Sequence, residues 1–236
     1  MYASAPSPTT PVIGLADDRR RAFMVKVYQH IALAFAVFVG LEVALFNGGI
    51  AERLFEMFFI DGGGGSWLLL LGAFMVVNWF AGQATAALDN PSKQYAGLFA
   101  IAAAYSVIFA PFLFYVFNYQ GAGTVVSAAV ITAIGFAVLT VIALTTATDL
   151  SFLRPIVMWG FGLALVAIIG AVLFGFNLGT WFSVAMIGVA GAAILYQTQS
   201  AQRTFPEEAY VAAAAGLFAS IMTMFWYVLR LLSARN

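Results

Sequence analysis

Residues 210–232, YVAAAAGLFASIMTMFWYVLRLL, decide how the rest of the chain is interpreted. No charged residue occurs between positions 209 and 229, a length of helix that crosses a hydrocarbon core of about 30 Å. Small side chains recur along this helix, at Ala212, Gly216, Ser220 and Thr223. Such a stripe lets neighbouring helices approach closely, because lipid gives helices no hydrophobic reason to associate. We therefore predict a transmembrane helix that is central and surrounded by protein.

The composition is that of a polytopic membrane protein. Hydrophobic residues make up 63% of the chain and charged residues 8%, against about 25% charged residues in soluble domains. The mean hydropathy is +0.97. The chain has no cysteine, which excludes disulfides, thiolate catalysis and cysteine-ligated metals. The formal net charge is zero and the basic residues are scattered, so we expect no nucleic-acid partner.

Apolar runs divide the rest of the chain into further crossings. The first run covers residues 23–46 and the second residues 67–88. The uncharged stretches 94–148 and 155–202 are each too long for one crossing, and we expect them to break at 118–123 and at 176–180. With the last helix, this predicts an all-α protein with seven transmembrane helices.

The chain ends are expected to lie outside this domain. Residues 1–14 are rich in Pro, Ser, Thr and Ala, which cannot bury enough apolar surface to fold alone. We predict a disordered tail over residues 1–22, a seven-helix transmembrane domain over residues 23–232, and a short C-terminal tail over residues 233–236.

The distribution of basic residues predicts the orientation. With the N-terminus in the cytoplasm, the cytoplasmic side holds Arg19, Arg20, Arg21, Lys26, Lys93, Arg154 and Arg203. The opposite side holds Arg53, Arg230 and Arg235. This asymmetry follows the positive-inside rule, so we expect the C-terminus to face the outside, or the periplasm if the protein lies in a bacterial inner membrane.

Several segments together resemble the Bax-inhibitor-like family, the transmembrane Bax inhibitor motif proteins that include the bacterial YccA type. The segments are ITA at 131–133, LTT at 144–146, DLSFL at 149–153, ILYQTQ at 194–199, LF at 217–218 and FWYVLRLL at 225–232. The likeness extends over residues 23–232. It implies seven helices, with the last wrapped by the other six, and a slow, pH-sensitive leak of calcium ions across the membrane.

The resemblance also implies a gate that this chain lacks. In family members with that leak, one aspartate on helix six and one on helix seven share a proton and hold the pore closed, but here Gln197 and Ser220 occupy these positions. Neither an amide nor a hydroxyl titrates in the useful range. Three alternatives remain: a permanent hydrogen bond between the two helices, with about 0.6–2 kcal/mol of stabilisation, a neutral polar ring that still passes ions, or no role.

Four of the other polar side chains within predicted helices are candidate titrating or pore residues. Glu42 is a functional candidate because intramembrane carboxylates are costly, although it could instead reach the interface or pair with Arg53. His30, the only histidine, is either a proton sensor or a packing residue that forms hydrogen bonds near Lys26. Asn78 and Gln83 in the second helix are expected to form hydrogen bonds between helices rather than to act in function.

A second stripe of small residues lies on the first helix, at Ala32, Ala36, Gly40 and Ala44. We expect it to mark where that helix packs within the bundle, with dimerisation as the alternative.

We expect no enzymatic activity, metal site or cofactor. His30 is the only histidine available to a serine protease or a metal site, and the chain has no GxSxG sequence. No aspartate falls inside a predicted helix, as an aspartyl protease would need, and both lysines lie at membrane edges, away from any buried Schiff base.

Two functions from different classes remain. The resemblance to YccA-like bacterial proteins implies binding to the membrane-anchored FtsH protease, which we favour, with the N-terminal tail as a handle. The alternative is a leak for calcium or another cation, in which Glu42 replaces the missing aspartates if it faces the bundle interior. Deletion of residues 1–21 discriminates the two, because it removes the handle and leaves a leak untouched.

Overall fold

The computed structural model describes residues 11–61 and 63–234. Its helices are α1 (Asp17–Asn47), α2 (Ile50–Phe55), α3 (Gly63–Thr85), α4 (Pro91–Tyr115), α5 (Ala122–Thr145), α6 (Leu153–Phe174), α7 (Gly179–Arg203) and α8 (Tyr210–Ser233). The shorter turns are η1 (Val12–Gly14), η2 (Glu56–Asp61), η3 (Val116–Gln120) and η4 (Glu207–Ala209). Within the described residues, the structure is helical apart from one isolated β-bridge between Pro11 and Pro206.

Within the described part of the chain, seven helices are long and apolar enough to cross a membrane, as the sequence predicts. They are α1, α3, α4 continued by η3, and α5 to α8. The two long uncharged stretches divide at glycines with positive φ. Gly121 has a φ of 93° between η3 and α5, and Gly175 has a φ of 72° after α6. Glycine adopts this conformation without the steric cost that a Cβ would add, so the chain reverses there.

The spans alternate in direction and give the bundle two chemically different ends. The basic end, where α1 begins, carries Arg19, Arg20, Arg21, Lys26, Lys93, Arg154 and Arg203. The basic residues that the structure describes at the opposite end are Arg53 and Arg230.

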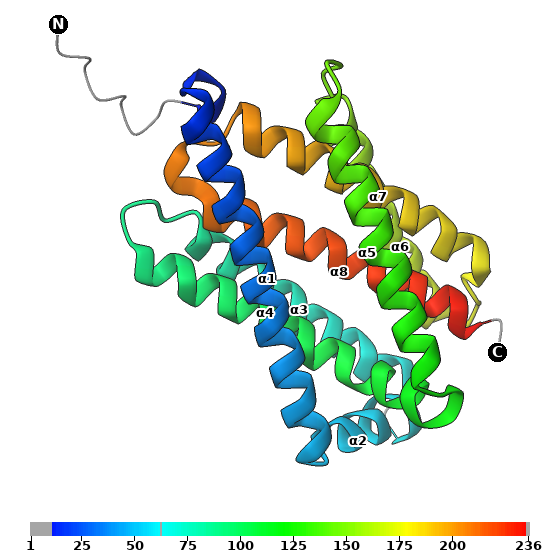
Figure 1. Cartoon of the computed structure of the whole chain (residues 1–236). Coiled ribbons are helices and arrows are strands. Elements are labelled where there is room, and N and C mark those ends of the chain that lie inside the picture. Colours follow the sequence, from blue (N-terminus) through cyan, green and yellow to red (C-terminus); the bar gives the residue numbers. More distant parts are fainter. Residues whose placement is uncertain (1–10, 62, 235–236) are drawn as a thin grey trace, which may run out of the picture.

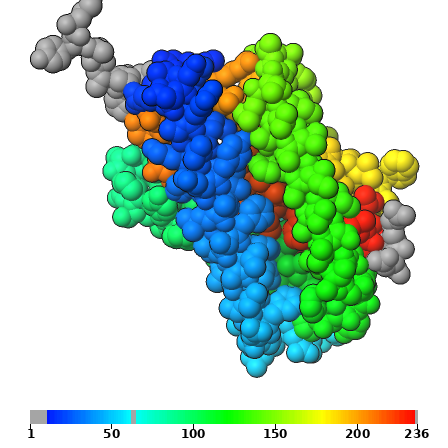
Figure 2. Space-filling view, viewed as in Figure 1, coloured from blue at the N-terminus to red at the C-terminus, as the bar shows by residue number. Residues whose placement is uncertain are grey.

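Helix α8 runs through the middle of the bundle, behind α1 and α5 (Figure 1). In its most apolar window, 72% of the residues are buried. It packs closely on α7, α1, α5, α4 and α3, and it reaches α6 through Tyr227, which clusters with Ala164. In the space-filling view, α1 and α5 cover most of α8, and a strip of it shows between them (Figure 2).

Helix α4 is a second buried helix that the sequence did not single out. In its span, 61% of the most apolar window is buried, against 6% for both α3 and α6. Its fully covered side chains include Leu98, Ala102, Phe109 and Ala110. Lipid and protein interior are equally apolar, so hydropathy does not distinguish a buried span from a lipid-facing one.

The small-residue stripe on α1 does not mark its packing face. Ala32, Ala36, Gly40 and Ala44 are all exposed. The buried face of α1 carries larger side chains instead, namely Phe23, Met24, Val27, Ile31, Ala34, Phe38 and Glu42. The predicted packing role is therefore wrong, and dimerisation through this stripe stays a prediction.

The folded domain begins before the predicted boundary at residue 23. Val12 is fully buried, and its backbone N–H donates to the carbonyl of Phe205 at 2.9 Å. Helix α1 starts at Asp17, and Arg19 forms an ion pair with Glu207 just before α8. Val12 and Arg19 therefore attach this segment to the α7–α8 connection. Residues 1–10 of the predicted tail lie outside the described residues.

Candidate functional site

Gln197 on α7 and Ser220 on α8 face each other inside the bundle. The Ser220 hydroxyl donates to Gln197 Oε1 at 3.1 Å, and Ser220 is buried. Gly216, one turn earlier on α8, also lies beside the amide, and a Cβ there would meet Gln197 Oε1 at 3.5 Å, an ordinary van der Waals distance. The predicted small-residue stripe on α8 thus accommodates a polar side chain from α7.

This contact contains no group that exchanges a proton near neutral pH. A neighbouring backbone carbonyl is also occupied, since the hydroxyls of Tyr105 and Thr223 both donate to Ala219, at 3.2 and 2.9 Å. The arrangement connects α4, α7 and α8 through neutral hydrogen bonds. It favours a permanent tie over a titrating pair at these two positions.

Gln199 is a structural link that sequence reasoning did not identify. Its Nε2 donates to the carbonyl of Thr148 at 2.8 Å, and its Oε1 accepts from the backbone N–H of Leu150 at 2.7 Å. One amide therefore holds the α5–α6 loop against α7. The loop segment DLSFL and the α7 segment ILYQTQ, which both carry the family resemblance, are in direct contact here.

Asp149 organises the same loop at the basic end. Its carboxylate accepts from the backbone N–H of Ser151 at 2.9 Å and from the Ser151 hydroxyl at 3.1 Å, and Arg203 lies 3.8 Å away. The two hydrogen bonds from Ser151 and the positive charge of Arg203 lower the pKa of Asp149. This carboxylate is exposed, so it stabilises the turn rather than a buried site.

Glu42 lies on the buried face of α1, and only 8% of its surface is exposed. Its neighbours one turn before and after, Phe38 and Phe46, contact Phe109 and Phe114 of α4, so this face of α1 points into the bundle. Neither carboxylate oxygen has a hydrogen-bond partner among the described residues. Arg53 is exposed on α2, and the alternative of a Glu42–Arg53 pair is not realised.

His30 links three helices near the basic end. Its Nδ1 lies 2.7 Å from the carbonyl of Lys26, and its Nε2 lies 2.9 Å from the Tyr95 hydroxyl on α4. The ring also contacts Tyr210 of α8, with centroids 4.9 Å apart. Twelve residues separate His30 from Glu42, about 18 Å along α1. The two side chains therefore do not form one site.

The two amides of α3 do not join helices. Asn78 Nδ2 donates to the carbonyl of Phe74 in its own helix at 2.9 Å, and Gln83 has an exposed side chain. The prediction of hydrogen bonds between helices is therefore wrong for Asn78. An amide can bond to the carbonyl four residues earlier in its own helix, and a helical pattern does not reveal that choice.

A vestibule of about 700 Å³, lined by both polar and apolar side chains, opens at the basic end between α1, α5 and α7. Its charged lining consists of Asp17, Arg20, Arg21 and Arg203, and Gln199 and Tyr28 also face it. Arg20 pairs with Asp17, and Arg203 lies near Asp149. The vestibule lining therefore keeps a net positive charge, which disfavours cations at this end of the bundle.

Comparison with known proteins supports the resemblance seen in these segments. The sequence profile of the family described as inhibitor of apoptosis-promoting Bax1 matches residues 20–236. No curated protein matches the chain significantly. The matched region covers the described spans apart from the first three residues of α1, and it includes the Gln197–Ser220 contact and the loop that Gln199 holds. The chain therefore belongs to the Bax-inhibitor-1-like family of integral membrane proteins.

Proposed function

We propose that this protein is a non-enzymatic cation leak in which Glu42 exchanges a proton for a cation. The buried carboxylate without partners carries the proposal. An ionised carboxylate that is buried alone costs several kcal/mol of solvation free energy. Such a group is stable when a proton or a cation neutralises it, and intramembrane carboxylates of this kind mark ion pathways.

Two further features concern the rate of the proposed leak and the group that would make it depend on pH. The neutral Gln197–Ser220 hydrogen bond leaves α7 and α8 tied at every physiological pH, so pH sensitivity would have to come from another group. The positive lining of the vestibule lowers the local concentration of cations at the basic end. The positive lining supports slow passage of calcium or another cation, and the neutral contact leaves Glu42 as the group from which pH dependence would come.

Flux into proteoliposomes tests the proposal. We expect calcium uptake by the native protein to differ between about pH 6 and about pH 8, which brackets the range in which buried carboxylic acids lose their proton. The Glu42→Gln variant keeps the size of the side chain and removes the charge. We expect it to lower the flux at least about tenfold, a barrier increase of about 1.4 kcal/mol, and to abolish the pH dependence.

The matched control is Glu52→Gln, which removes an exposed carboxylate on α2. This variant should conduct like the native protein. If Glu42→Gln retains native flux and pH dependence, Glu42 is not the gate. If the native protein is silent and a Gln197→Asp plus Ser220→Asp variant conducts, the chain has lost the leak of its family, and the leak proposal is wrong.

A second proposal, in which the protein restrains an FtsH-type membrane protease, rests on the N-terminal attachment. Pro11 and Val12 pair with Pro206 and Phe205, and Arg19 pairs with Glu207. A partner that holds the tail would therefore act directly on the α7–α8 connection, near the end of the helix that carries Gln197. Binding of the tail would thereby act on the packing of α7 and α8 in the bundle.

Deletion of residues 1–10 separates this proposal from the leak. The deletion keeps the described contacts of Pro11 and Val12, so the fold should persist. Under the second proposal, the truncated protein no longer co-purifies with FtsH, and calcium flux is unchanged. Undiminished co-purification would exclude the tail as the handle.

A further inference from the structure

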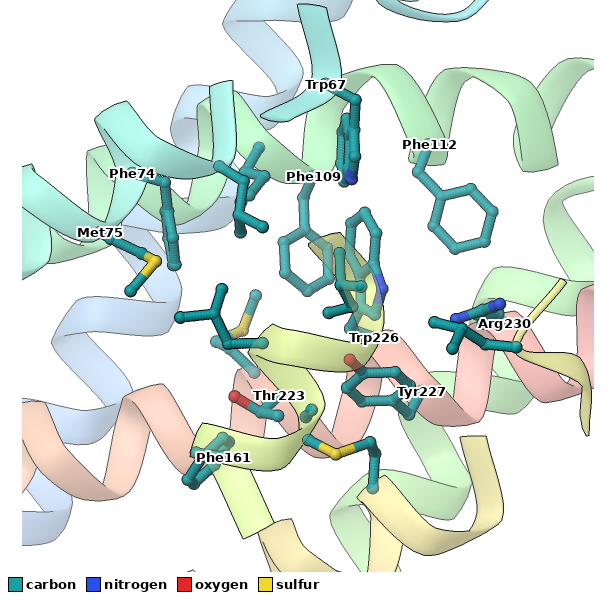
Figure 3. A pocket seen from close by; sticks show the side chains of 18 of the residues that line it. Trp67, Phe74, Met75, Phe109, Phe112, Phe161, Thr223, Trp226, Tyr227 and Arg230 are labelled. Atoms are coloured by element: carbon teal, nitrogen blue, oxygen red, sulfur yellow. The ribbon is translucent and has the colours of Figure 1, made fainter. Parts of the chain in front are cut away.

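An apolar cavity of about 680 Å³ lies between α3, α4, α6 and α8, and Tyr105 and Thr223 line its inner end. Figure 3 shows its aromatic lining, with Trp67, Phe109, Phe112 and Trp226 near Arg230, and Phe161, Phe74 and Met75 farther from it. Its size and lining are those of small-molecule sites, which occupy about 300–1,000 Å³ and are mostly apolar.

The cavity borders the two spans that are least covered by protein. Only 6% of the most apolar window is buried in each of α3 and α6, so both helices face lipid over most of their length. These two helices have few contacts with each other compared with their contacts to α4 and α7. The adjacent bilayer is therefore the direct source of an occupant.

The cavity is elongated along the membrane normal. Its lining residues on α6 run from 161 to 172, about 16 Å of helix and close to half of a hydrocarbon core of about 30 Å. On α8, the lining runs from Met222 to Arg230, which lies in the last turns of the helix. The cavity thus extends from one membrane interface to the middle of the bilayer, which is the depth that one acyl chain covers.

The end of the cavity at the interface carries a positive charge. The Arg230 guanidinium lies over the ring of Phe182, with 5.8 Å from Cζ to the centroid, and it forms no ion pair with a carboxylate of the described residues. Beside it, Trp67 and Trp226 stack with centroids 5.8 Å apart. Tryptophans of this kind sit at the level of lipid headgroups, and arginine binds phosphate through several N–H donors.

We propose that this cavity binds a phospholipid from the leaflet opposite the basic end, with one acyl chain between α3 and α6 and the phosphate at Arg230. A partner helix fits less well, because a helix about 10 Å across and 16 Å long occupies roughly 1,300 Å³, more than the cavity holds. The hydroxyls of Tyr105 and Thr223, at the inner end, are already bonded to Ala219, which leaves an apolar lining for the end of the chain.

Tryptophan fluorescence provides the test. Trp79, Trp159 and Trp181 are 61%, 71% and 81% exposed, so their replacement by Phe leaves the fold intact and keeps Trp67 and Trp226 as reporters. This triple variant in detergent is titrated with phosphatidylglycerol brominated on its acyl chains, since bromine quenches tryptophan on contact. We expect quenching that saturates at a low mole fraction of lipid. Quenching that only rises in proportion to lipid means non-specific contact and overturns the proposal.

Filling the cavity should prevent binding. A Cβ at Gly162, which lines the cavity, meets no atom within 4 Å, so Gly162→Phe places a ring in open space. Gly188→Phe is the matched control, because Gly188 also has an open Cβ position and lies outside the cavity lining. We expect saturable quenching to disappear in Gly162→Phe and to persist in Gly188→Phe. Ala171→Phe fills the same cavity if the first variant does not fold, and equal quenching in filled and control variants overturns the proposal.

Removing the charge tests the phosphate contact separately. Arg230→Gln should weaken binding of brominated phosphatidylglycerol about tenfold, the size expected for a lost charge-assisted hydrogen bond. Arg53→Gln removes an exposed arginine at the same end of the bundle and should leave binding unchanged. Brominated diacylglycerol, which lacks phosphate, should bind weakly and be indifferent to Arg230→Gln. If it binds as well as phosphatidylglycerol, the cavity accepts acyl chains without a headgroup contact, and the proposed phosphate site is wrong.

Discussion

At the scale of single residues, Gln199 provides the firmest prediction. Its amide satisfies the buried N–H of Leu150 and the carbonyl of Thr148, and Gln199→Ala would leave both without a partner. We expect a loss of about 1–3 kcal/mol of unfolding free energy, the cost of one unsatisfied buried polar group, because Leu150 is buried whereas Thr148 is exposed to solvent. Denaturant unfolding in detergent measures the loss.

Two further variants separate the effect of losing the Gln199 hydrogen bonds from the effect of changing a residue type in α7. Gln202→Ala, on the same helix, removes an amide of equal size and should cost little. Gln199→Glu keeps an acceptor for Leu150 but buries a carboxylate with one oxygen against the carbonyl of Thr148, so its stability should be no higher than that of Gln199→Ala. Equal stability of Gln199→Ala and Gln202→Ala would contradict the structural role.

Asp149 predicts a dependence of stability on acid pH. Hydrogen bonds from Ser151 and the charge of Arg203 lower its pKa below the ordinary value of 3.8. Its contribution to stability is therefore complete above that value and is lost as the pH falls through the lowered pKa of the folded protein. Thermal unfolding between about pH 6 and about pH 2 should show this acid loss in the native protein and less of it in Asp149→Asn. Asp89→Asn, in an exposed loop at the same end, should retain the native profile.

The sequence revealed only some of the important residues. Glu42 stands out because a carboxylate inside an apolar run is costly, and its position inside the bundle agrees with that reasoning. The pairing of Gln197 with Ser220 followed from the resemblance alone. Gln199 was missed because its partners are backbone groups about fifty positions earlier in the chain, and side-chain patterns do not encode such contacts.

At the scale of helices, the α3–α4 contact depends on one glycine. A Cβ on Gly97 would lie 2.6 Å from the carbonyl oxygen of Ala81 and 2.9 Å from the backbone N of Thr85. Backbone atoms cannot move aside as a flexible side chain does, so α3 and α4 must separate. We expect Gly97→Ala to cost about 1–3 kcal/mol, as overpacking does. Thermal unfolding of the purified protein measures this cost.

Gly82→Ala is the control within α3, because a Cβ there meets no atom within 4 Å. It should be neutral or stabilise the helix by up to about 1 kcal/mol, since alanine restricts the unfolded chain more than glycine does. If the two substitutions have equal effects, the close contact at Gly97 does not control helix packing.

The number of helices was predictable, and their orientation about their own axes was not. Charged loops and glycines at Gly121 and Gly175 mark where spans end. The face that each helix turns to its neighbours depends on shape, and the exposed stripe at Ala32, Ala36, Gly40 and Ala44 shows that small residues alone do not identify it. The buried face of α1 instead uses Phe23 and Phe38, whose larger surfaces fill the space beside α4 and α8.

At the scale of the whole molecule, the two ends of the bundle differ in charge. Seven basic side chains lie at the end where α1 begins, namely Arg19, Arg20, Arg21, Lys26, Lys93, Arg154 and Arg203. Two of them form ion pairs, Arg19 with Glu207 and Arg20 with Asp17. The positive-inside rule counts Lys and Arg near membrane ends and gives little weight to acidic residues. The basic end should therefore lie in the cytoplasm despite these pairs.

The absence of cysteine makes this orientation directly measurable, because any thiol label reports a single introduced site. Ala16→Cys lies at the basic end and Ala234→Cys at the opposite end, and both positions are exposed. In intact cells or bacterial spheroplasts, a maleimide that cannot cross the membrane should label position 234 and leave position 16 unlabelled until the membrane is broken. The reverse pattern would invert the molecule, and it would place the cavity between α3 and α6 in the cytoplasmic leaflet. Labelling of both sites in intact cells would contradict an odd number of crossings, because seven spans must put the two ends of the chain on opposite sides.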